Sequence, residues 1–301
     1  MNIRKILQQM AGLVLVMLFL VGCGASAASP TPVPSTATPT PEPPTATPTP
    51  VPPTETPTLV MPTETPTLTL EPQIKILVVG NSMIATYEDM GRKGLDQHME
   101  QLAGSADPPF VMQADALYKD GATLKNIWET TKAREMISEG GYDIVVLQED
   151  IPETDVATFQ DYARKFDAEI KESGAKTVLF MAHAYMRLGW ISMEEIAQAH
   201  RDIAAELDID VAPVGLAMKR AMDESRDLGM YMDMYYEDRE HPNLHGSYLA
   251  ANIVYATVFG ESPIGLAYLP SEEGGVTVTE EEAAFLQRIA WETVQEYQAQ
   301  K

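Results

Sequence analysis

The sequence predicts an α/β fold for residues 73–301, a three-layer α/β/α sandwich around a central parallel sheet of five strands. Two observations predict it. Short apolar runs rich in β-branched residues alternate here with longer stretches in which apolar residues recur at helical spacing. These residues also have the length of one domain with its own hydrophobic core. Elements that alternate in this way form a parallel sheet with helices on both faces.

Each expected element follows from its own run of residues. The expected strands are five buried runs: Ile74–Val79, Phe110–Ala114, Ile144–Leu147, Val178–Ala182 and Ile209–Val214. The expected helices between them are Tyr87–Leu102, Leu124–Ser138, Asp155–Glu172, Met193–Leu207 and Ala217–Asp227. A further helix is expected from near Ser247, and the last helix opens with the capping box Thr279-x-x-Glu282. In such sheets the reacting groups follow the carboxyl ends of the strands, so a site is expected there.

The first 72 residues are predicted to lie outside this domain. Residues 1–23 show the pattern of a secretory signal and end in Leu20-Val21-Gly22-Cys23, which resembles the lipobox of bacterial lipoproteins. Residues 24–72 hold repeated Thr-Pro units that can form neither a core nor regular hydrogen bonding, so we expect a stalk. We therefore expect an extracytoplasmic protein held at the bacterial cell surface by a lipid on Cys23. The alternative is an ordinary signal peptide with an incidental cysteine.

Charge and cysteine content exclude several classes of function. The chain has 44 acidic and 21 basic residues, a net charge of −23, which would repel nucleic acid and an anionic bilayer. The same charge also suits a plain soluble surface. The one cysteine excludes an internal disulfide framework and a cysteine-rich metal site. We expect no nucleic acid partner, a membrane contact through the N-terminal lipid only, and a monomer.

A serine follows the first expected strand, in Gly80-Asn81-Ser82. Serine at such a turn is either a nucleophile or a helix cap, and a nucleophile needs a neighbouring base. Of the five histidines, His98 and His200 lie in polar helical stretches and are expected at the solvated surface. His183 ends the fourth strand, where it either lines a pocket or caps the strand.

His241 is the strongest candidate for the base. Asp238 stands three residues before it and can turn its carboxylate onto the near ring nitrogen, which leaves the far nitrogen for the serine proton. Pro242 keeps the pair in a loop and argues against His241 and His245 as a metal pair on one helix. The alternating methionines of Met230–Tyr236 suit either copper ligation or, more simply, one buried face.

At these residues the sequence resembles the SGNH hydrolases, the GDSL esterase superfamily. Ile76–Ser82 resembles their first block, with Asn81 where an aspartate often stands, and Gly121 is similar to the glycine of the second block. Asp238-x-x-His241-Pro242-Asn243, followed by Gly246–Ala251, is similar to the fifth block. The matches run in the family's order from about Ile74 to Pro263, most of the domain.

The resemblance implies a three-layer fold and a Ser-His-Asp mechanism that needs no metal or organic cofactor. Ser82 would be the nucleophile, His241 the general base and then acid, and Asp238 its orienting carboxylate. The oxyanion hole would use the backbone amides of Ser82 and Gly121 and an amide side chain of the third block. There the usual asparagine is absent from Leu147–Asp150, so we expect Gln148 to donate instead. The alternative is a glutamine that only satisfies backbone groups.

These expectations lead to a surface-anchored serine esterase. We expect it to hydrolyse an O-acetyl or other O-acyl group on an extracellular carbohydrate, with Asn81, His183 and Tyr185 as candidates for the substrate pocket. Tyr185 and Trp190 suit a sugar-stacking platform or ordinary packing equally. Two other functions stay open: a non-catalytic module that binds glycan or protein on a degenerate hydrolase fold, and an acyltransferase that uses the same triad.

Overall fold

The computed structural model describes residues 74–87, 91–149, 151–185, 189–272 and 274–300. The predicted signal peptide, Cys23 and the predicted stalk lie outside the described residues, so they stay predictions. Among the helices of the described residues, none has the length and apolar character that crossing a bilayer requires.

The described residues contain a five-stranded parallel sheet, which confirms the predicted fold class. The strands are β1 (Ile74–Gly80), β2 (Met112–Tyr118), β3 (Ile144–Glu149), β4 (Lys176–Met181) and β5 (Asp210–Ala212). They lie in the order β2-β1-β3-β4-β5, and every neighbouring pair is parallel. All carboxyl ends therefore meet at one edge, with β1 and β3 side by side in the middle.

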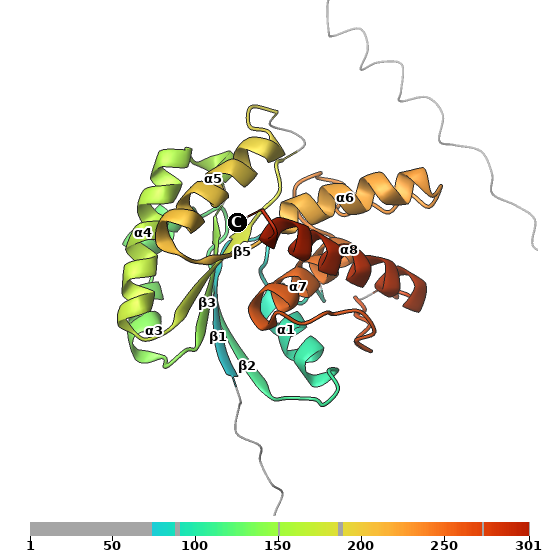
Figure 1. The fold of residues 1–301 in the computed structure, drawn as a ribbon, viewed down its shortest axis with the longest axis horizontal. Coiled ribbons are helices and arrows are strands. Elements are labelled where there is room, and N and C mark those ends of the chain that lie inside the picture. Colours follow the sequence, from blue (N-terminus) through green and yellow to red (C-terminus); the bar gives the residue numbers. More distant parts are fainter. Residues whose placement is uncertain (1–73, 88–90, 150, 186–188, 273, 301) are drawn as a thin grey trace, which may run out of the picture. The chain divides into compact units, whose positions relative to one another are not determined.

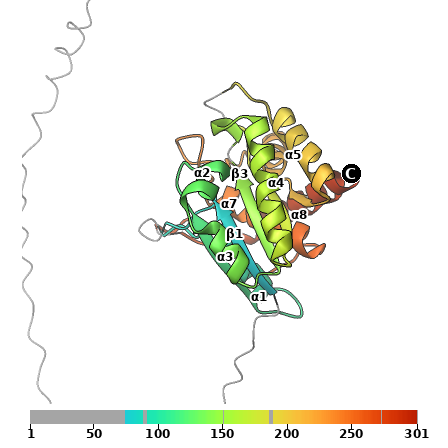
Figure 2. The ribbon, with the colours of Figure 1, turned by 90° about the vertical axis from the view of Figure 1, so that its left-hand side faces the viewer.

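Helices cover both faces of this sheet, as Figures 1 and 2 show. On one face lie α1 (Leu95–Gly104), α6 (Val214–Asp227), α7 (Leu244–Phe259) and α8 (Glu280–Gln298). On the other lie α2 (Leu124–Thr130), α3 (Ala133–Glu139), α4 (Val156–Glu172) and α5 (Met193–Leu207). A short 3₁₀ helix, η3 (Ile151–Glu153), follows β3.

The alternation of β1 divides the hydrophobic core into two layers. Ile76 and Val78 pack against the helices of the first face, and Leu77 and Val79 pack against those of the second. All four side chains are fully buried. Each such burial stabilises the fold by about 1.5–3 kcal/mol, so β1 anchors the turn that follows it.

The three largest differences from the prediction lie in α1, in the helix that divides into α2 and α3, and in β2. The first helix begins at Leu95 instead of Tyr87, because Gly91 has a left-handed φ of 63° and Gly94 takes the N-cap position. The stretch predicted as one helix breaks at Thr131, whose hydroxyl donates to the carbonyl of Ile127. β2 is the third difference, because it runs over Met112–Tyr118 instead of Phe110–Ala114. As an edge strand it has a largely half-buried surface, and its apolar signal is weak.

The surface assignment of two histidines is wrong. His98 and His200 are 2% and 1% exposed. The Nδ1 of His98 bonds the Tyr268 hydroxyl (3.0 Å), and the Nδ1 of His200 bonds the Ile196 carbonyl (2.8 Å). Burial lowers the pKa of His98 to about 3 and that of His200 to about 4, so both rings are neutral at pH 7.

Candidate functional site

Three side chains from distant parts of the sequence meet beyond the carboxyl end of β1. The Nε2 of His241 lies 3.0 Å from the Oγ of Ser82, and its Nδ1 lies 2.8 Å from the Oδ2 of Asp238. Because the carboxylate can only accept, Nδ1 carries a proton and Nε2 is left to accept the serine proton. This is the geometry of a nucleophile, a base and an orienting acid.

Asp238 is held as a carboxylate by its own loop. Its Oδ1 accepts hydrogen bonds from the backbone N–H groups of Glu240 and His241, both at 2.9 Å. Burial opposes ionisation, but the hydrogen bonds from these two amides and from the His241 ring are together stronger and lower the pKa of Asp238. Its charge therefore faces the His241 ring at neutral pH.

The loop that carries His241 is fixed at the start of α7. The Asn243 side chain caps this helix by accepting from the N–H of Gly246 (3.1 Å), and its amide donates to the carbonyls of Asp233 and Tyr235. Gly246 has no room for a side chain, since an added Cβ would lie 2.3 Å from the Met234 carbonyl oxygen. Asn243 and Gly246 therefore fix the position of the His241 loop relative to the start of α7.

The serine turn is held by hydrogen bonds from Asn81. The backbone N–H of Asn81 donates to the Oε1 of Gln148 (2.8 Å), and its side-chain oxygen accepts from the N–H of Met83 (3.0 Å). Its side-chain amide reaches the Ala122 carbonyl in the loop after β2 (3.2 Å). Asn81 thus ties the ends of β1, β2 and β3 together.

The loop after β2 carries Gly121, which has a left-handed φ of 61° that favours glycine. Two bonds hold the loop beside the serine turn: the Lys119 N–H donates to the Gly80 carbonyl (3.0 Å), and the Leu124 N–H donates to the Glu149 carboxylate (3.2 Å). The three loops of the predicted oxyanion hole are therefore neighbours.

Gln148 has one amide atom that the fold does not use. The residue is fully buried at the end of β3, and its Oε1 accepts from Asn81. Its Nε2 is buried and finds no hydrogen-bond partner among the described residues. Because a buried donor without a partner costs about 1–3 kcal/mol, its presence beside the serine turn needs an explanation.

The three residues predicted to line a substrate pocket do not present open surface. Asn81, His183 and Tyr185 are each 3% exposed or less, and their assignment to a substrate pocket stays a prediction. His183 instead supports the base, because its Nε2 bonds the Glu240 carbonyl at 2.8 Å next to His241. Burial lowers the pKa of His183 to about 4, which keeps the ring neutral and leaves Nε2–H as the donor.

Sequence reasoning missed two side chains at Ser82. The Arg92 guanidinium donates to the carbonyl of Ser82, and the Tyr87 hydroxyl donates to Asp120 (2.7 Å). Burial and the bond to Asp120 raise the pKa of Tyr87 to about 12, while the nearby Ser82 side chain acts in the opposite direction. Both residues lie in the stretch predicted as a helix, which would not place them beside Ser82. The helix begins only at Leu95, so both precede it.

The described ranges contain no group of three or more His, Cys, Asp or Glu side chains that could hold a metal ion. In the methionine segment Met232 and Met234 are buried with Tyr235, whereas Met230 is 43% exposed, so the predicted alternation of one buried face holds only in part. The Nε2 of His245 lies 3.3 Å from the Oε1 of Glu282, so this histidine pairs with α8 and not with Ser82.

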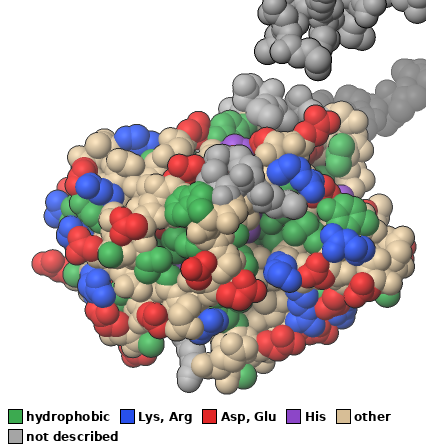
Figure 3. Space-filling model, turned by 90° about the horizontal axis from the view of Figure 1, so that it is seen from above, with side chains coloured by type: hydrophobic (Ala, Val, Ile, Leu, Met, Phe, Trp, Pro, Cys, Tyr) green, Lys and Arg blue, Asp and Glu red, His purple; other side chains and the backbone are tan. Residues whose placement is uncertain are grey.

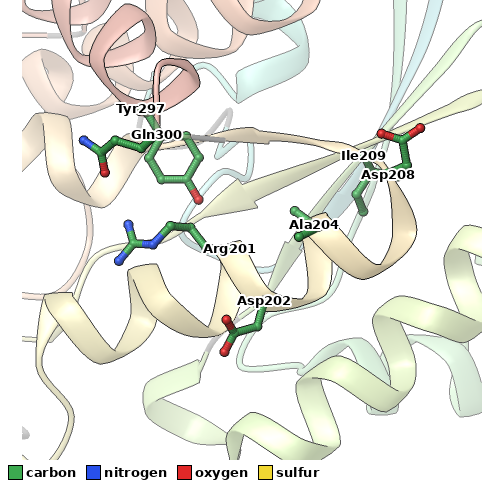
Figure 4. A pocket seen from close by; sticks show the side chains of 8 residues that line it. Arg201, Asp202, Ala204, Asp208, Ile209, Tyr297 and Gln300 are labelled. Carbon is green, nitrogen blue, oxygen red and sulfur yellow. The ribbon is translucent and has the colours of Figure 1, made fainter.

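A separate hollow of about 460 Å³ lies between the end of α5, the start of β5 and the end of α8 (Figure 4). Figure 4 shows Arg201 and Tyr297 side by side within it. It adjoins the amino end of β5, and none of its lining side chains forms a nucleophile–base pair. We therefore place the candidate site at Ser82 instead.

The surface seen from above, in Figure 3, carries both signs of charge. Acidic and basic side chains are interspersed there around hydrophobic ones. A mixed surface of this kind imposes less electrostatic selection on a ligand than the net charge alone predicts.

No protein-family model matches the sequence, and no curated protein matches it. Among solved structures, a DUF4886 family protein from Bacteroides uniformis is similar over 74% of this chain and 95% of its own, at 16% identity and a TM-score of 0.56. A candidate SGNH hydrolase from Slackia heliotrinireducens covers 62% and 98% (22% identity, TM-score 0.48). A catalytic mutant of Axe2, an acetylxylan esterase from Geobacillus stearothermophilus, covers 62% and 94% (14% identity, TM-score 0.49).

The chain is thus similar to solved structures that include SGNH hydrolases. At these identities the similarity shows the fold alone, and the DUF4886 structure is the one of the three whose TM-score exceeds 0.5. The three-layer fold that the resemblance implied is confirmed. What the residues at Ser82 do is argued from their own geometry.

Proposed function

We propose that this protein is an SGNH-type serine esterase that works through an acyl-enzyme. One observation carries the proposal: His241 joins Ser82 (3.0 Å) and Asp238 (2.8 Å) through its two ring nitrogens. These distances lie in the range for a serine activated by a base that a third group orients.

In the proposed reaction the Ser82 oxygen attacks the ester carbonyl carbon while His241 Nε2 takes the serine proton. The C–O bond to the leaving alcohol then breaks, and the alcohol oxygen takes that proton from Nε2. Water adds to the acyl-enzyme in the same way, and the acid product leaves as Ser82 regains its proton. The Asp238 carboxylate stabilises the charged imidazole in both halves and is not itself protonated.

The negative oxygen of each tetrahedral intermediate needs donors that are already in place. We propose the backbone N–H groups of Ser82 and Gly121 together with the Nε2 of Gln148. The missing partner of that buried amide supports its role, since an unused donor is available without breaking a bond of the folded state. Preorganised donors of this kind contribute about 2.7–4 kcal/mol each to lowering the barrier.

We propose an O-acyl group on an extracellular carbohydrate as the substrate. Trp190 supports this choice, because it is 58% exposed and lies in the segment that follows β4 at the same sheet edge. An exposed indole offers a flat apolar face on which a sugar ring can stack. Tyr185 is buried and does not share this role.

The test compares two substrates on two variants. We expect the purified protein to release acetate from O-acetylated xylo-oligosaccharides and to turn over p-nitrophenyl acetate. Trp190→Ala should lower kcat/KM for the oligosaccharide by about tenfold, the effect of one lost stacking contact, and leave the small ester unchanged. Leu228→Ala, another exposed apolar residue (61%), is the matched control.

Each contrary result has a definite meaning. Equal loss on both substrates, or no loss on either, would contradict a stacking role for Trp190. Turnover of the small ester without acetate release from any glycan would contradict the carbohydrate. Acetyl transfer to a sugar hydroxyl in place of water would favour the acyltransferase, and absence of all turnover by folded protein would favour the binding module.

A further inference from the structure

Arg92 is a buried cation directly beneath the serine turn. It is 4% exposed, and its Nη2 donates to the carbonyl oxygens of Ser82 (3.2 Å) and Met83 (3.4 Å). Among the described residues, no carboxylate forms an ion pair with it. The hydrogen bonds of its Nη2 therefore go to the backbone of the nucleophile and of the residue after it.

Two tyrosine rings enclose the guanidinium. Its carbon lies 5.4 Å from the ring centre of Tyr87 and 5.8 Å from that of Tyr236. Tyr87 and Arg92 also exchange backbone hydrogen bonds (2.9 and 3.0 Å), and the Tyr236 hydroxyl donates to Glu272 (2.9 Å). Such rings attract a planar cation through their electron-rich faces, so Arg92 is held in one orientation.

Tyr236 connects this cluster to the base. Its backbone N–H donates to the carbonyl of His241 (2.9 Å), and its own carbonyl accepts from the N–H of Arg239 (3.0 Å). The ring that covers Arg92 and the backbone that holds the histidine loop therefore belong to one residue. A path of direct contacts runs from the Ser82 carbonyl through Arg92 and Tyr236 to His241.

A purely structural role does not explain this arrangement well. Burying a cation that has only neutral backbone oxygens as acceptors is costly, and an apolar side chain would fill the same space at lower cost. Burial lowers the pKa of Arg92, and the neighbouring acidic groups Tyr236, Tyr87, Glu272 and Asp238 oppose this. What the guanidinium adds is direction, because one of its nitrogens, Nη2, donates to two consecutive carbonyls at once.

We propose that Arg92 is a positioning residue for the reaction, which fixes the Ser82 turn at the correct distance from the His241 loop. The inference rests on the proposed esterase function. A misplacement of about 1 Å at reacting atoms can lower a rate by about 100-fold, so a turn loosened at Ser82 reduces kcat. Because Arg92 is 4% exposed and lies beneath the turn, we expect it to act through Ser82 and to leave KM unchanged.

The test uses Arg92→Lys and Arg92→Met with p-nitrophenyl acetate, and Arg220→Met as the control. Arg220 is also partly buried and joins α6 to α8 through Glu292 and Glu296, but these contacts lie outside the serine turn. We expect Arg92→Met to lose about 10–100-fold in kcat at unchanged KM, with Arg92→Lys in between. Arg220→Met should lower thermal stability and leave the kcat of the folded fraction unchanged.

A second measurement reports on the contact between Ser82 and His241 and does not depend on enzymatic activity. The ring-nitrogen NMR signals of His241 report its bond to the Ser82 oxygen, and they should shift in Arg92→Met and stay fixed in Arg220→Met. Unchanged kcat together with unchanged His241 signals in folded Arg92→Met would overturn the inference. An inactive wild-type protein would contradict the proposed function. The NMR comparison would then still show whether Arg92 positions the Ser82 turn relative to His241.

Discussion

The two polar atoms of the Gln148 side chain have different roles, one in the fold and one in the proposed chemistry. The oxygen end accepts from the N–H of Asn81 and so fixes the serine turn, and the nitrogen end is buried without a partner among the described residues. An asparagine is one methylene shorter, so the glutamine carries its donor further from the strand end. Substituting this one residue separates the two tasks.

Gln148→Glu keeps the acceptor for Asn81 and removes the donor. We expect kcat for p-nitrophenyl acetate to fall by about 10²–10³-fold or more, since a carboxylate would also repel the oxyanion. Gln160→Glu is the matched control, because Gln160 donates to the Ala199 carbonyl in the helix layer. A kcat of Gln148→Glu within twofold of the control would show that Gln148 only supports the turn.

The triad could be predicted from sequence because its signals are local. Asp238 and His241 are three residues apart, and Ser82 follows a run whose apolar character fixes the end of β1. The role of Arg92 could not be predicted, since it depends on a ring, Tyr236, that lies far along the chain. The burial of His98 depends in the same way on Tyr268.

At the level of elements, the start of α7 carries the histidine loop. Asn243 caps the helix, and Gly246 in its first turn packs against the Met234 carbonyl oxygen and the Cβ of Pro242, which an added Cβ would approach to 2.3 and 3.1 Å. Pro242 follows His241 directly. The packing of one glycine therefore determines where the base lies.

Gly246→Ala tests this packing. Helix propensity alone predicts stabilisation, but the steric overlap should lower the free energy of unfolding by about 1–3 kcal/mol and reduce turnover. Gly104→Ala is the control at the end of α1, where an added methyl group meets no atom within 4 Å. Chemical denaturation and p-nitrophenyl acetate kinetics measure both effects. Equal stability and turnover in the two variants would refute the account of the loop.

The order and layers of the elements were predictable, and some of their ends were not. Buried central strands such as β3 give continuous apolar runs, and its predicted start at Ile144 is confirmed. The edge strand β2 pairs only with β1 and contains polar residues. Its apolar pattern therefore placed the predicted strand several residues too early in the sequence. Gly91 and Gly94 displaced the start of α1, because backbone conformation outweighed the apolar spacing there.

For the molecule as a whole, three buried histidines link stability to pH. Burial lowers the pKa of His98 to about 3 and those of His183 and His200 to about 4, from an ordinary value of 6.5. Between about pH 6.5 and 4 the unfolded chain therefore binds protons at these sites that the folded protein does not. Stability is fully present above that window and is lost as pH falls through it.

We expect the free energy of unfolding to fall across this window by on the order of 1 kcal/mol per pH unit for each of the three rings. His200→Phe should make the fall shallower. The new ring can still pack against Phe159, whose ring centre lies 4.7 Å from that of His200, but it cannot titrate. Urea unfolding at several pH values measures the slope. An unchanged slope in His200→Phe would contradict the assignment of a buried neutral ring.

The central claim is that Ser82 is a nucleophile activated by His241. The most direct measurement is labelling of the purified full-length protein with a fluorophosphonate probe, followed by mass spectrometry of the modified residue. We predict a single label on Ser82, no label in Ser82→Ala, a greatly slowed reaction in His241→Ala, and wild-type labelling in Ser138→Ala, which alters an exposed serine of α3. Absence of a label in folded wild-type protein, or its attachment to another residue, would contradict the account.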